Sequence, residues 1–352
     1  MQHDSHTMNS TAAQIQLPAE WQAQSAVMLV WPHEDTDWSP YLEDVIPCFV
    51  AIAQAIIPYE KLIIVCRSMD AVKKDLGDTD FSKIIFREIP SNDTWARDFG
   101  AISVIANETL CLLDFTFNGW GLKFAANHDN QITRKLYESK TFRSDVLLKN
   151  MQFMVLEGGS IESDGAGTLL TTTQCLLSAN RNSHKDRPEI EEFLKMLFDL
   201  KRILWLKNGY LAGDDTDSHI DTLARFCDEK TIAYVQCTDP KDEHFEALSA
   251  MEFELQSFKT IDGEAYRLLP LPMADAVYEQ GERLPATYAN FLIINGAVLM
   301  PTYNSHLDET AKNRLQTAFP DRKIIGINCL PLIRQHGSLH CVTMQFPAGF
   351  VE

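Results

Sequence analysis

Apolar runs alternate along the chain with longer segments whose apolar residues recur every three or four positions. The runs are rich in Val, Ile and Leu, as buried strands are, whereas the spacing in the longer segments is typical of amphipathic helices. The predicted strands lie at 25–31, 61–66, 83–89, 100–105, 109–115, 167–172, 221–226, 231–237, 290–301 and 323–330. The predicted helices lie at 41–56, 188–200, 241–258 and 308–319. This alternation predicts an α/β protein.

Two of the predicted strand regions read as hairpins. In NFLIINGAVLMP, at 290–301, an Asn-Gly pair separates two apolar runs, and the triplet ANE separates two others at 101–115. Such antiparallel pairs fit badly with a plain doubly wound parallel sheet. No Pro/Ser-rich linker divides the chain. We therefore expect a polar N-terminal lead at 1–16 and one domain at 17–352, built from several similar strand and helix units.

The charge of the chain narrows the classes of partner. The chain has 31 Lys and Arg residues and 49 Asp and Glu residues, which gives a formal net charge of −18 at pH 7. A surface this acidic repels nucleic acid and anionic lipid and favours the approach of a cationic small molecule. The N-terminus resembles no secretory signal, and no apolar stretch approaches the roughly eighteen residues of a membrane helix. We expect a cytoplasmic protein without nucleic-acid or membrane partners, and a homodimer is the ordinary expectation.

One cysteine stands apart from the others. The chain has eight cysteines and no CxxC pair, and several lie inside apolar runs, so most are expected to be reduced core thiols and a structural zinc site is not expected. Cys341 instead follows a Gly-Ser turn and a histidine, in HGSLHCVT. A buried cysteine is usually a small core hydrophobe, and this remains the alternative to a nucleophile.

A second unusual segment is GDDTDSHIDTLARF at 213–226, which contains Asp215, Asp217, His219 and Asp221. At a spacing of two, these side chains are expected to point the same way as the segment enters a strand. A solvated acidic loop is the simpler alternative. A calcium loop is excluded, because the sixth position counted from Asp215 is isoleucine where the motif needs glycine.

Two further segments place acids at the ends of apolar runs. SNDTWARDFGAISV carries Trp95, Arg97 and Asp98 just before a strand, where Arg97 and Asp98 could also form a surface ion pair. VLEGGSIESDGAG carries Glu157 before two glycines, which permit a close approach of backbone or ligand. The glycines lack the lysine of a P-loop and the dinucleotide fingerprint, so a phosphate site is not favoured.

One thiol, one histidine among acids and several carboxylates suit the chemistry of a guanidinium group. Its pKa is about 13, so it arrives as a cation with a poorly electrophilic carbon. Carboxylates would hold its N–H groups, a thiolate would attack the carbon, and an acid would protonate the departing ammonia. Acids around His219 are expected to favour its charged form, whereas they raise the pKa of Cys341.

Six segments together resemble the agmatine deiminase and bacterial peptidylarginine deiminase family. They are LPAEWQAQSAVMLVWPHEDTDW, NDTWARDFG, FNGWGLKF, LEGGSIESDGAGT, DDTDSHIDTLARF and HGSLHCVT, and they occur in the family's order and spacing. The resemblance runs from about residue 16 to the C-terminus. It implies a five-bladed α/β propeller, the pentein fold, made of pseudo-fivefold ββαβ modules around an acidic pocket.

The same resemblance implies a role for each matching residue. Cys341 would form a covalent thiouronium intermediate, and His219 would protonate ammonia and then activate water. Asp98 and Asp221 would clamp the guanidinium, with Glu157 beside them. No metal or organic cofactor is implied. His336 and His340 are interpreted as structural, since neighbours on a strand point to opposite faces and His340 would not serve Cys341.

The resemblance favours agmatine as the substrate. Asp215 occupies the position of the acid that meets the distal amine in agmatine deiminases, and Trp95 is placed to pack the aliphatic spacer. The chain departs from the agmatine deiminase pattern at two places on the expected pocket wall. It reads RQHGSLHC where GGGNIHC is typical, and NGWGLKF where a second glycine is common. Peptidylarginine or free arginine remain alternative substrates. A cysteine amidase and a non-catalytic guanidine or polyamine binder remain alternative functions.

Overall fold

The computed structural model describes residues 14–352. Residues 1–13 of the predicted polar lead lie outside the described part. Strand β1 (Ile15–Gln16) pairs with β5 (Ile102–Ala106), so the folded chain begins at least two residues before the predicted boundary. Among the described residues, no helix has both the length and the apolar character needed to cross a bilayer.

Five ββαβ units make up the structure, and each joins an antiparallel strand pair to a third, parallel strand through a helix. The first unit contains β19 (Thr343–Pro347), β2 (Gln24–Val30), α1 (Leu42–Ile56) and β3 (Lys61–Cys66), extended by α2 (Met69–Leu76) and β4 (Ile84–Glu88). The second contains β5, β6 (Thr109–Thr116), α5 (Ile132–Glu138) and β7 (Leu147–Val155).

The remaining units repeat this plan. The third contains β8 (Ile161–Ser163), β9 (Thr168–Thr172), α8 (Arg187–Phe198) and β10 (Arg202–Leu206). The fourth contains β11 (Ala224–Asp228), β12 (Thr231–Gln236), α9 (Phe245–Ser257) and β13 (Arg267–Pro272). The fifth contains β16 (Leu292–Ile294), β17 (Ala297–Thr302), α10 (Asp308–Ala318) and β18 (Lys323–Asn328). The short elements are α3 (Ala96–Phe99), α4 (Gly119–Leu122), α6 (Thr173–Leu176), α7 (Ala179–Asn182), α11 (Leu330–Ile333), β14 (Tyr278–Glu279) and β15 (Glu282–Arg283).

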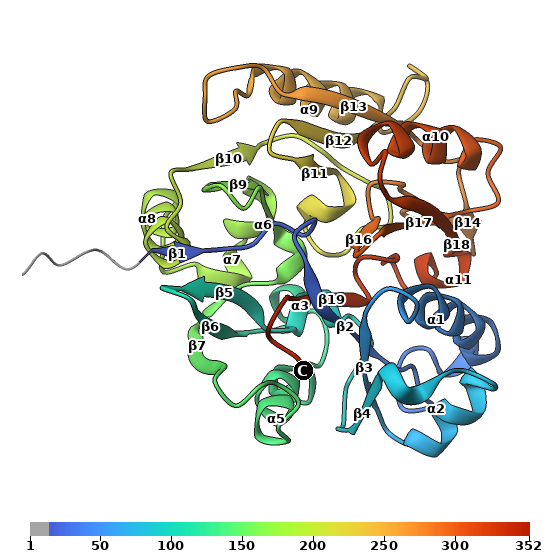
Figure 1. Cartoon of the computed structure of the whole chain (residues 1–352). Helices are drawn as coiled ribbons and strands as arrows, with labels where there is room; N and C mark the ends of the chain where they lie inside the picture. The colour runs from blue at the N-terminus through green and yellow to red at the C-terminus, as the bar shows by residue number, and fades with distance from the viewer. Residues whose placement is uncertain (1–13) are drawn as a thin grey trace, which may run out of the picture.

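The units lie around a common centre, with the α5, α8, α9 and α10 helices toward the outside (Figure 1). The last strand, β19, pairs with the early strand β2, with Thr343 opposite Leu29, and so joins the two ends of the chain in one sheet. This arrangement agrees with the predicted fold class. It also carries the residues just before β19 to the centre of the molecule.

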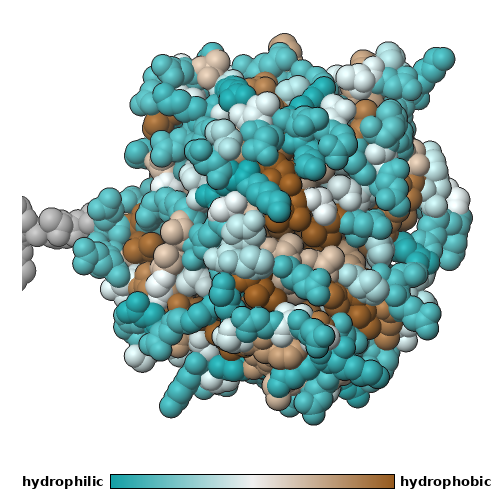
Figure 2. All heavy atoms as spheres, turned by 45° about the vertical axis from the view of Figure 1, so that its right-hand side comes forward, coloured by the Kyte–Doolittle hydropathy of each residue, from teal (hydrophilic) through white to brown (hydrophobic). Residues whose placement is uncertain are grey.

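Neighbouring units share their hydrophobic cores. The largest buried cluster draws residues from four units, for example Leu29, Leu112, Ala233 and Leu299. Two smaller clusters join the second unit to the third and the third to the fourth. Each of these clusters therefore crosses the boundary between sheets of different units. On the face in Figure 2, hydrophilic side chains cover most of the surface and hydrophobic ones gather near its middle.

Candidate active site

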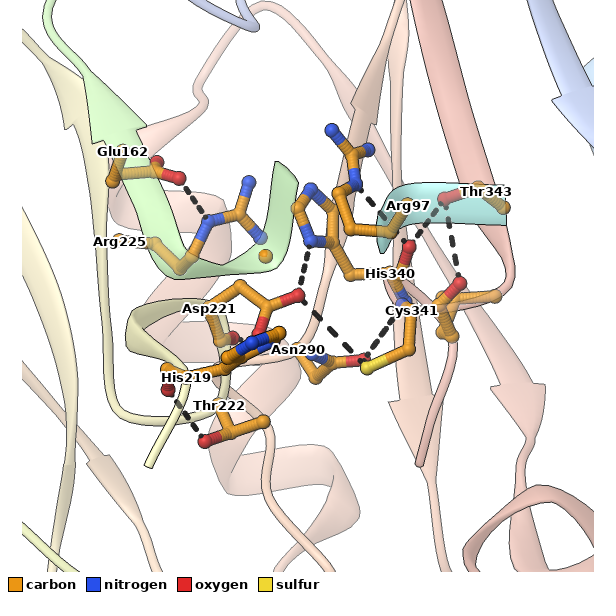
Figure 3. A network of polar contacts seen from close by, with 12 residues as sticks. Arg97, Glu162, His219, Asp221, Thr222, Arg225, Asn290, His340, Cys341 and Thr343 are labelled. Carbon is orange, nitrogen blue, oxygen red and sulfur yellow. Dashed lines mark hydrogen bonds and ion pairs between the residues drawn. The ribbon is translucent and has the colours of Figure 1, made fainter. Parts of the chain in front are cut away.

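Cys341 lies in the turn that precedes β19, near the centre of the molecule. Its side chain is buried, and its Sγ lies 3.4 Å from Asn290 Oδ1 and 3.9 Å from Asp221 Oδ2 (Figure 3). The backbone N–H of Cys341 also donates to Asn290 Oδ1, at 3.4 Å. Burial, together with the charges of Asp221 and Asp98, raises the pKa of the Cys341 thiol well above its ordinary value. The free thiol is therefore protonated at neutral pH.

Asp221 lies in the 3₁₀ turn Ile220–Thr222, which His219 caps at its N-terminal end and which leads into β11. Two threonines hold the backbone of His219: Thr216 Oγ1 accepts from its N–H, and Thr222 Oγ1 donates to its carbonyl. Within the described structure, neither ring nitrogen of His219 has a hydrogen-bond partner. Burial lowers the pKa of His219 to about 3, despite the opposing charge of Asp221. The expectation of a charged His219 is thus wrong, because desolvation outweighs the nearby acids.

The period-two alignment expected for residues 215–221 is also wrong. Asp217 and Ser218 have φ values of 66° and 61°, which break an extended run. Asp217 instead forms ion pairs with Lys123 at 2.8 Å and with Arg181 at 2.5 Å. Strand β11 begins only at Ala224, so Asp221 belongs to the turn and not to the predicted strand.

Asp98 lies in the short helix α3, and both of its oxygens are held by N–H donors. Trp120 Nε1 donates to Oδ2 at 2.9 Å, and the backbone N–H of Gly159 donates to Oδ1 at 2.9 Å. His219 Nδ1 is 3.5 Å from Oδ1. Burial raises the pKa of Asp98 well above its ordinary range, and the charge of Asp221 adds to the effect. A cation bound between the two acids would reverse this shift.

Gly159 shows how closely these groups converge. A Cβ atom at this position would lie 2.6 Å from His219 Nδ1, 2.7 Å from Asp98 Oδ1 and 3.2 Å from Asp221 Oδ2. Only a residue without a side chain leaves these three groups around one point. The glycines after Glu157 are predicted to permit a close approach of other groups, and at Gly159 those groups are His219, Asp98 and Asp221.

We expect Gly159→Ala to lower kcat/KM about 100-fold, because displacing His219 and Asp98 by even 1 Å spoils their alignment. Steady-state kinetics and thermal unfolding measure the effect. Gly326→Ala is the matched control, since its Cβ would touch only the methyl group of Thr302, 3.0 Å away and outside the pocket. Full activity in Gly159→Ala with an unchanged Tm would contradict this arrangement.

Glu157 is fully buried, but its carboxylate is already paired. Arg181 Nε donates to Oε1 at 2.9 Å and to Oε2 at 3.0 Å. Arg181 also binds Asp217 and the carbonyl of Thr216, and it thereby ties α7 to the loop that carries His219. Glu157 does not line the cavity over Cys341, and neither do His219 and Asp221. Sequence reasoning missed Arg181, although a buried acid requires such a partner.

Glu157, Cys175 and His219 form the one group of potential metal ligands found among the described residues, with ligand atoms within 4.8 Å of one another. The group fits a metal ion poorly. Arg181 neutralises the Glu157 carboxylate at close range. Burial raises the pKa of Cys175 well above its usual value, so its thiolate would be costly to form.

A cavity of ≈ 30 Å³ lies over Cys341 and Asp98. Trp95 and Trp120 form part of its wall, and Asp215 lies at the same cavity. Burial raises the pKa of Asp215 to about 6. Trp95 packs so closely on Gly337 that a Cβ there would lie 2.1 Å from its ring. The other lining residues are Asp37, Asp93, Phe124, Thr216, Gln335 and His336.

His340, interpreted from the sequence as structural, does not contact Cys341 Sγ but contacts Asp221. Its Nδ1 lies 2.8 Å from Asp221 Oδ2, and its Nε2 lies 2.7 Å from Glu20 Oε2. Asn290, Trp120 and Glu20 were likewise missed as neighbours of the site. Glu20 and Trp120 lie in two of the six segments that carry the family resemblance, whereas nothing in the local sequence marks Asn290.

Residues 16–347 match the family described as Porphyromonas-type peptidyl-arginine deiminase. An agmatine deiminase of Pseudomonas syringae pv. tomato is 32% identical over 98% of this chain and 99% of its own. A Porphyromonas gingivalis structure, described provisionally as an arginine deiminase, is 54% identical over 96% of this chain and 100% of its own, with a TM-score of 0.93. A substrate-bound agmatine deiminase from C. jejuni is 40% identical over 97% and 98%, with a TM-score of 0.90.

These matches cover nearly the whole chain and confirm the resemblance seen in the six sequence segments. The two structures share the α/β architecture described above over at least 96% of this chain. The chain belongs to the Porphyromonas-type peptidyl-arginine deiminase family.

Proposed function

We propose that this protein hydrolyses agmatine to N-carbamoylputrescine and ammonia. The observation that carries the proposal is the convergence of His219, Asp98 and Asp221 on one buried point, with the Cys341 thiol 3.9 Å from Asp221. Two carboxylates suit the N–H groups of a guanidinium, the thiol suits its carbon, and an unpaired imidazole suits proton transfer.

The first half of the reaction forms a covalent intermediate. In the free enzyme the Cys341 thiol is protonated and His219 is neutral, by the pKa shifts above. A guanidinium between Asp98 and Asp221 favours the thiolate by its charge, and the thiol proton passes to His219. Cys341 Sγ then bonds to the guanidinium carbon. One C–N bond breaks as His219 returns the proton to the departing ammonia, which leaves a thiouronium on Cys341.

The second half releases the product. His219, again neutral, accepts a proton from a water molecule as the water oxygen bonds to the thiouronium carbon. The C–S bond then breaks, and the hydroxyl proton of the intermediate passes to the departing Cys341 sulfur. His219, whose pKa is low, releases the proton that it took from water to solvent, where ammonia accepts it. The product is the neutral urea, N-carbamoylputrescine. Water has replaced one nitrogen, so the reaction needs neither an oxidant nor a reductant.

The pocket mouth favours agmatine over the other substrates that the relatives' names suggest. Agmatine, free arginine and peptidyl-arginine share a guanidinium and differ at the far end. Asp37, Asp93 and Asp215 line the pocket, and no Lys or Arg among the described residues does. An ammonium group pairs with these acids, a free carboxylate is repelled by them, and a neutral peptide group leaves them unpaired. The cytoplasmic location and the homodimer stay predictions.

The proposal is tested by ammonia release from agmatine, free arginine and an N-acylated arginine amide, each assayed separately. Release from agmatine, with kcat/KM at least about 100-fold above the other two, is the expected result, because an unpaired charge in the mouth costs about 3 kcal/mol. Release only from the capped arginine would move the activity to peptides. Tight binding without release from any guanidine would indicate a non-catalytic binder.

The pKa of Asp215, raised to about 6 by burial, predicts how agmatine binding depends on pH. Asp215 is ionised above pH 6 and neutral below it, so the KM for agmatine should rise as the pH falls from 7 to 5. Asp215→Asn should raise this KM about tenfold at pH 8, the worth of one charge-assisted hydrogen bond. Butylguanidine, which lacks the distal amine, is the control substrate. Equal changes in KM for both substrates would contradict a role of Asp215 at the amine.

A further inference from the structure

Behind the site, a histidine links two buried carboxylates. His340 lies 2.8 Å from Asp221 Oδ2 through Nδ1 and 2.7 Å from Glu20 Oε2 through Nε2, and His340 is 2% exposed. Carboxylates only accept hydrogen bonds, so the ring satisfies both contacts when each of its nitrogens carries a proton. Figure 3 shows the His340 ring turned toward Asp221 and the Cys341 side chain turned away from that ring.

The environment holds this imidazole in one orientation. The backbone N–H of His340 donates to Asn290 Oδ1 at 2.8 Å, and the backbone N–H of Ile293 donates to Glu20 Oε1 at 2.7 Å. Three charged groups lie close to His340 and Glu20: Arg225, 3.0 Å from Glu20 Oε1, Arg97, 3.6 Å from Glu20 Oε2, and Glu162, which pairs with Arg225 at 2.9 Å. The charges of Glu60 and Arg322 also act on Glu20, without a direct ion pair.

His340 and Glu20 are separated from the substrate pocket. Both line a second cavity, of ≈ 70 Å³, which also contacts Arg97 and Glu162 but not Cys341. Neither lines the pocket that contains Cys341 and Asp98. Among the side-chain contacts of His340, the one with Asp221 is therefore the link to the groups beside Cys341.

The two acids of the guanidinium clamp, Asp98 and Asp221, differ in pKa because His340 contacts only Asp221. The Asp221 carboxylate is fully buried, and Oδ1 has no hydrogen-bond partner within the described structure. Burial raises the pKa of both acids, but in Asp221 the hydrogen bond and charge of His340 outweigh it and the pKa falls below its ordinary value. In Asp98, which has no such cation, the pKa stays raised. Asp221 is thus ionised before substrate arrives, with Oδ1 free to accept from it.

We propose that His340 and Glu20 are positioning residues that keep the Asp221 carboxylate charged and oriented beside Cys341. This inference rests on the proposed function, since it gives Asp221 its task as the permanently charged half of the guanidinium clamp. His340 sets the orientation through Nδ1, and Glu20 holds the imidazole and its second proton through Nε2.

Two substitutions of His340 separate the contacts. In His340→Asn the side-chain amide nitrogen takes the place of Nδ1 and keeps the donor to Asp221. In His340→Gln it takes the place of Nε2 and keeps only the contact with Glu20. We expect kcat/KM to fall about tenfold in His340→Asn and at least about 100-fold in His340→Gln, with the acid limb of the pH profile moved to higher pH in His340→Gln. Equal losses and superimposable pH profiles, at equal Tm, would overturn the proposal.

Glu20→Gln tests the second member of the pair. It keeps the acceptor for the Ile293 N–H but removes the charge that holds the imidazole, so the acid limb should move to higher pH. Glu60→Gln is the matched control: Glu60 is a buried acid that accepts from the Asn295 N–H at 3.1 Å and makes no contact with His340. Coincident pH profiles for these two variants would also overturn the proposal.

A measurement without turnover distinguishes this inference from the proposed function. Calorimetric binding of butylguanidine to the His340 variants should show a loss of affinity at pH 6 in His340→Gln that is at least about tenfold larger than in His340→Asn. If the wild type releases no ammonia from any guanidine while this asymmetry is present, the proposed function fails and the positioning pair stands. If turnover is normal and the asymmetry is absent, the proposed function stands and the positioning role of His340 and Glu20 fails.

Discussion

Replacing Cys341 by alanine should leave a folded protein that binds agmatine but turns it over at least about 10⁴-fold more slowly, because no other group can bond to the guanidinium carbon. Affinity should stay within about threefold, since the clamp acids and His219 keep their own partners in the variant. Ammonia release measures turnover, and calorimetry measures binding.

Cys227→Ala is the matched control for this variant. Cys227 is a buried cysteine on β11 that belongs to the hydrophobic core and makes no contact with the pocket. Its loss should lower the Tm while leaving kcat/KM unchanged. Residual ammonia release by Cys341→Ala above one per cent of the wild-type rate would contradict a nucleophilic role, and a large loss of affinity would mean that Cys341 serves mainly in binding.

Asp98→Asn should weaken substrate binding about 10³-fold, because it removes a charge from a fully buried clamp and places an amide against one of two N–H donors. The pKa of Asp98 is raised in the free site, so a bound cation must drive its ionisation. Binding to the wild type should therefore release a proton and tighten as the pH rises. The variant should lose this pH dependence.

Calorimetry in buffers of different ionisation enthalpy measures the released proton. Asp114→Asn is the matched control, since Asp114 is a buried acid whose pKa is also raised, but it pairs with Arg134 on the second unit and lies outside the pocket. An unchanged proton release in Asp98→Asn would assign the proton to another group and contradict the pKa shift described for Asp98.

The hydrophobic pattern located the strands that are buried on both faces. The predicted ranges 61–66 and 231–237 agree with β3 and β12 to within one residue, and helix α1 begins one residue after its predicted start. The pattern missed β7, β10 and β13, and also the strands β1, β8, β14, β15 and β19. Strand β7 mixes exposed and buried positions and β13 contains prolines, so neither presents a continuous apolar run.

The fivefold plan itself came from the family resemblance and not from periodicity. The units share their topology but not a visible sequence repeat, because many different apolar side chains can fill equivalent core positions. The pairing of β19 with β2 joins residues more than 300 positions apart in the sequence. No local pattern predicts such a contact.

The sequence by itself determined the α/β class, the family and the acidic net charge, and it supplied Cys341, His219, Asp98 and Asp221 as candidate site residues, because these follow from composition and from short segments of fixed order. Only the tertiary structure decided how each group behaves. It paired Glu157 with Arg181, placed His340 between Asp221 and Glu20, and left His219 neutral and Asp221 charged. The physical reason is that ionisation depends on burial and on partners brought from distant parts of the chain, and neither is visible until the units close around their centre.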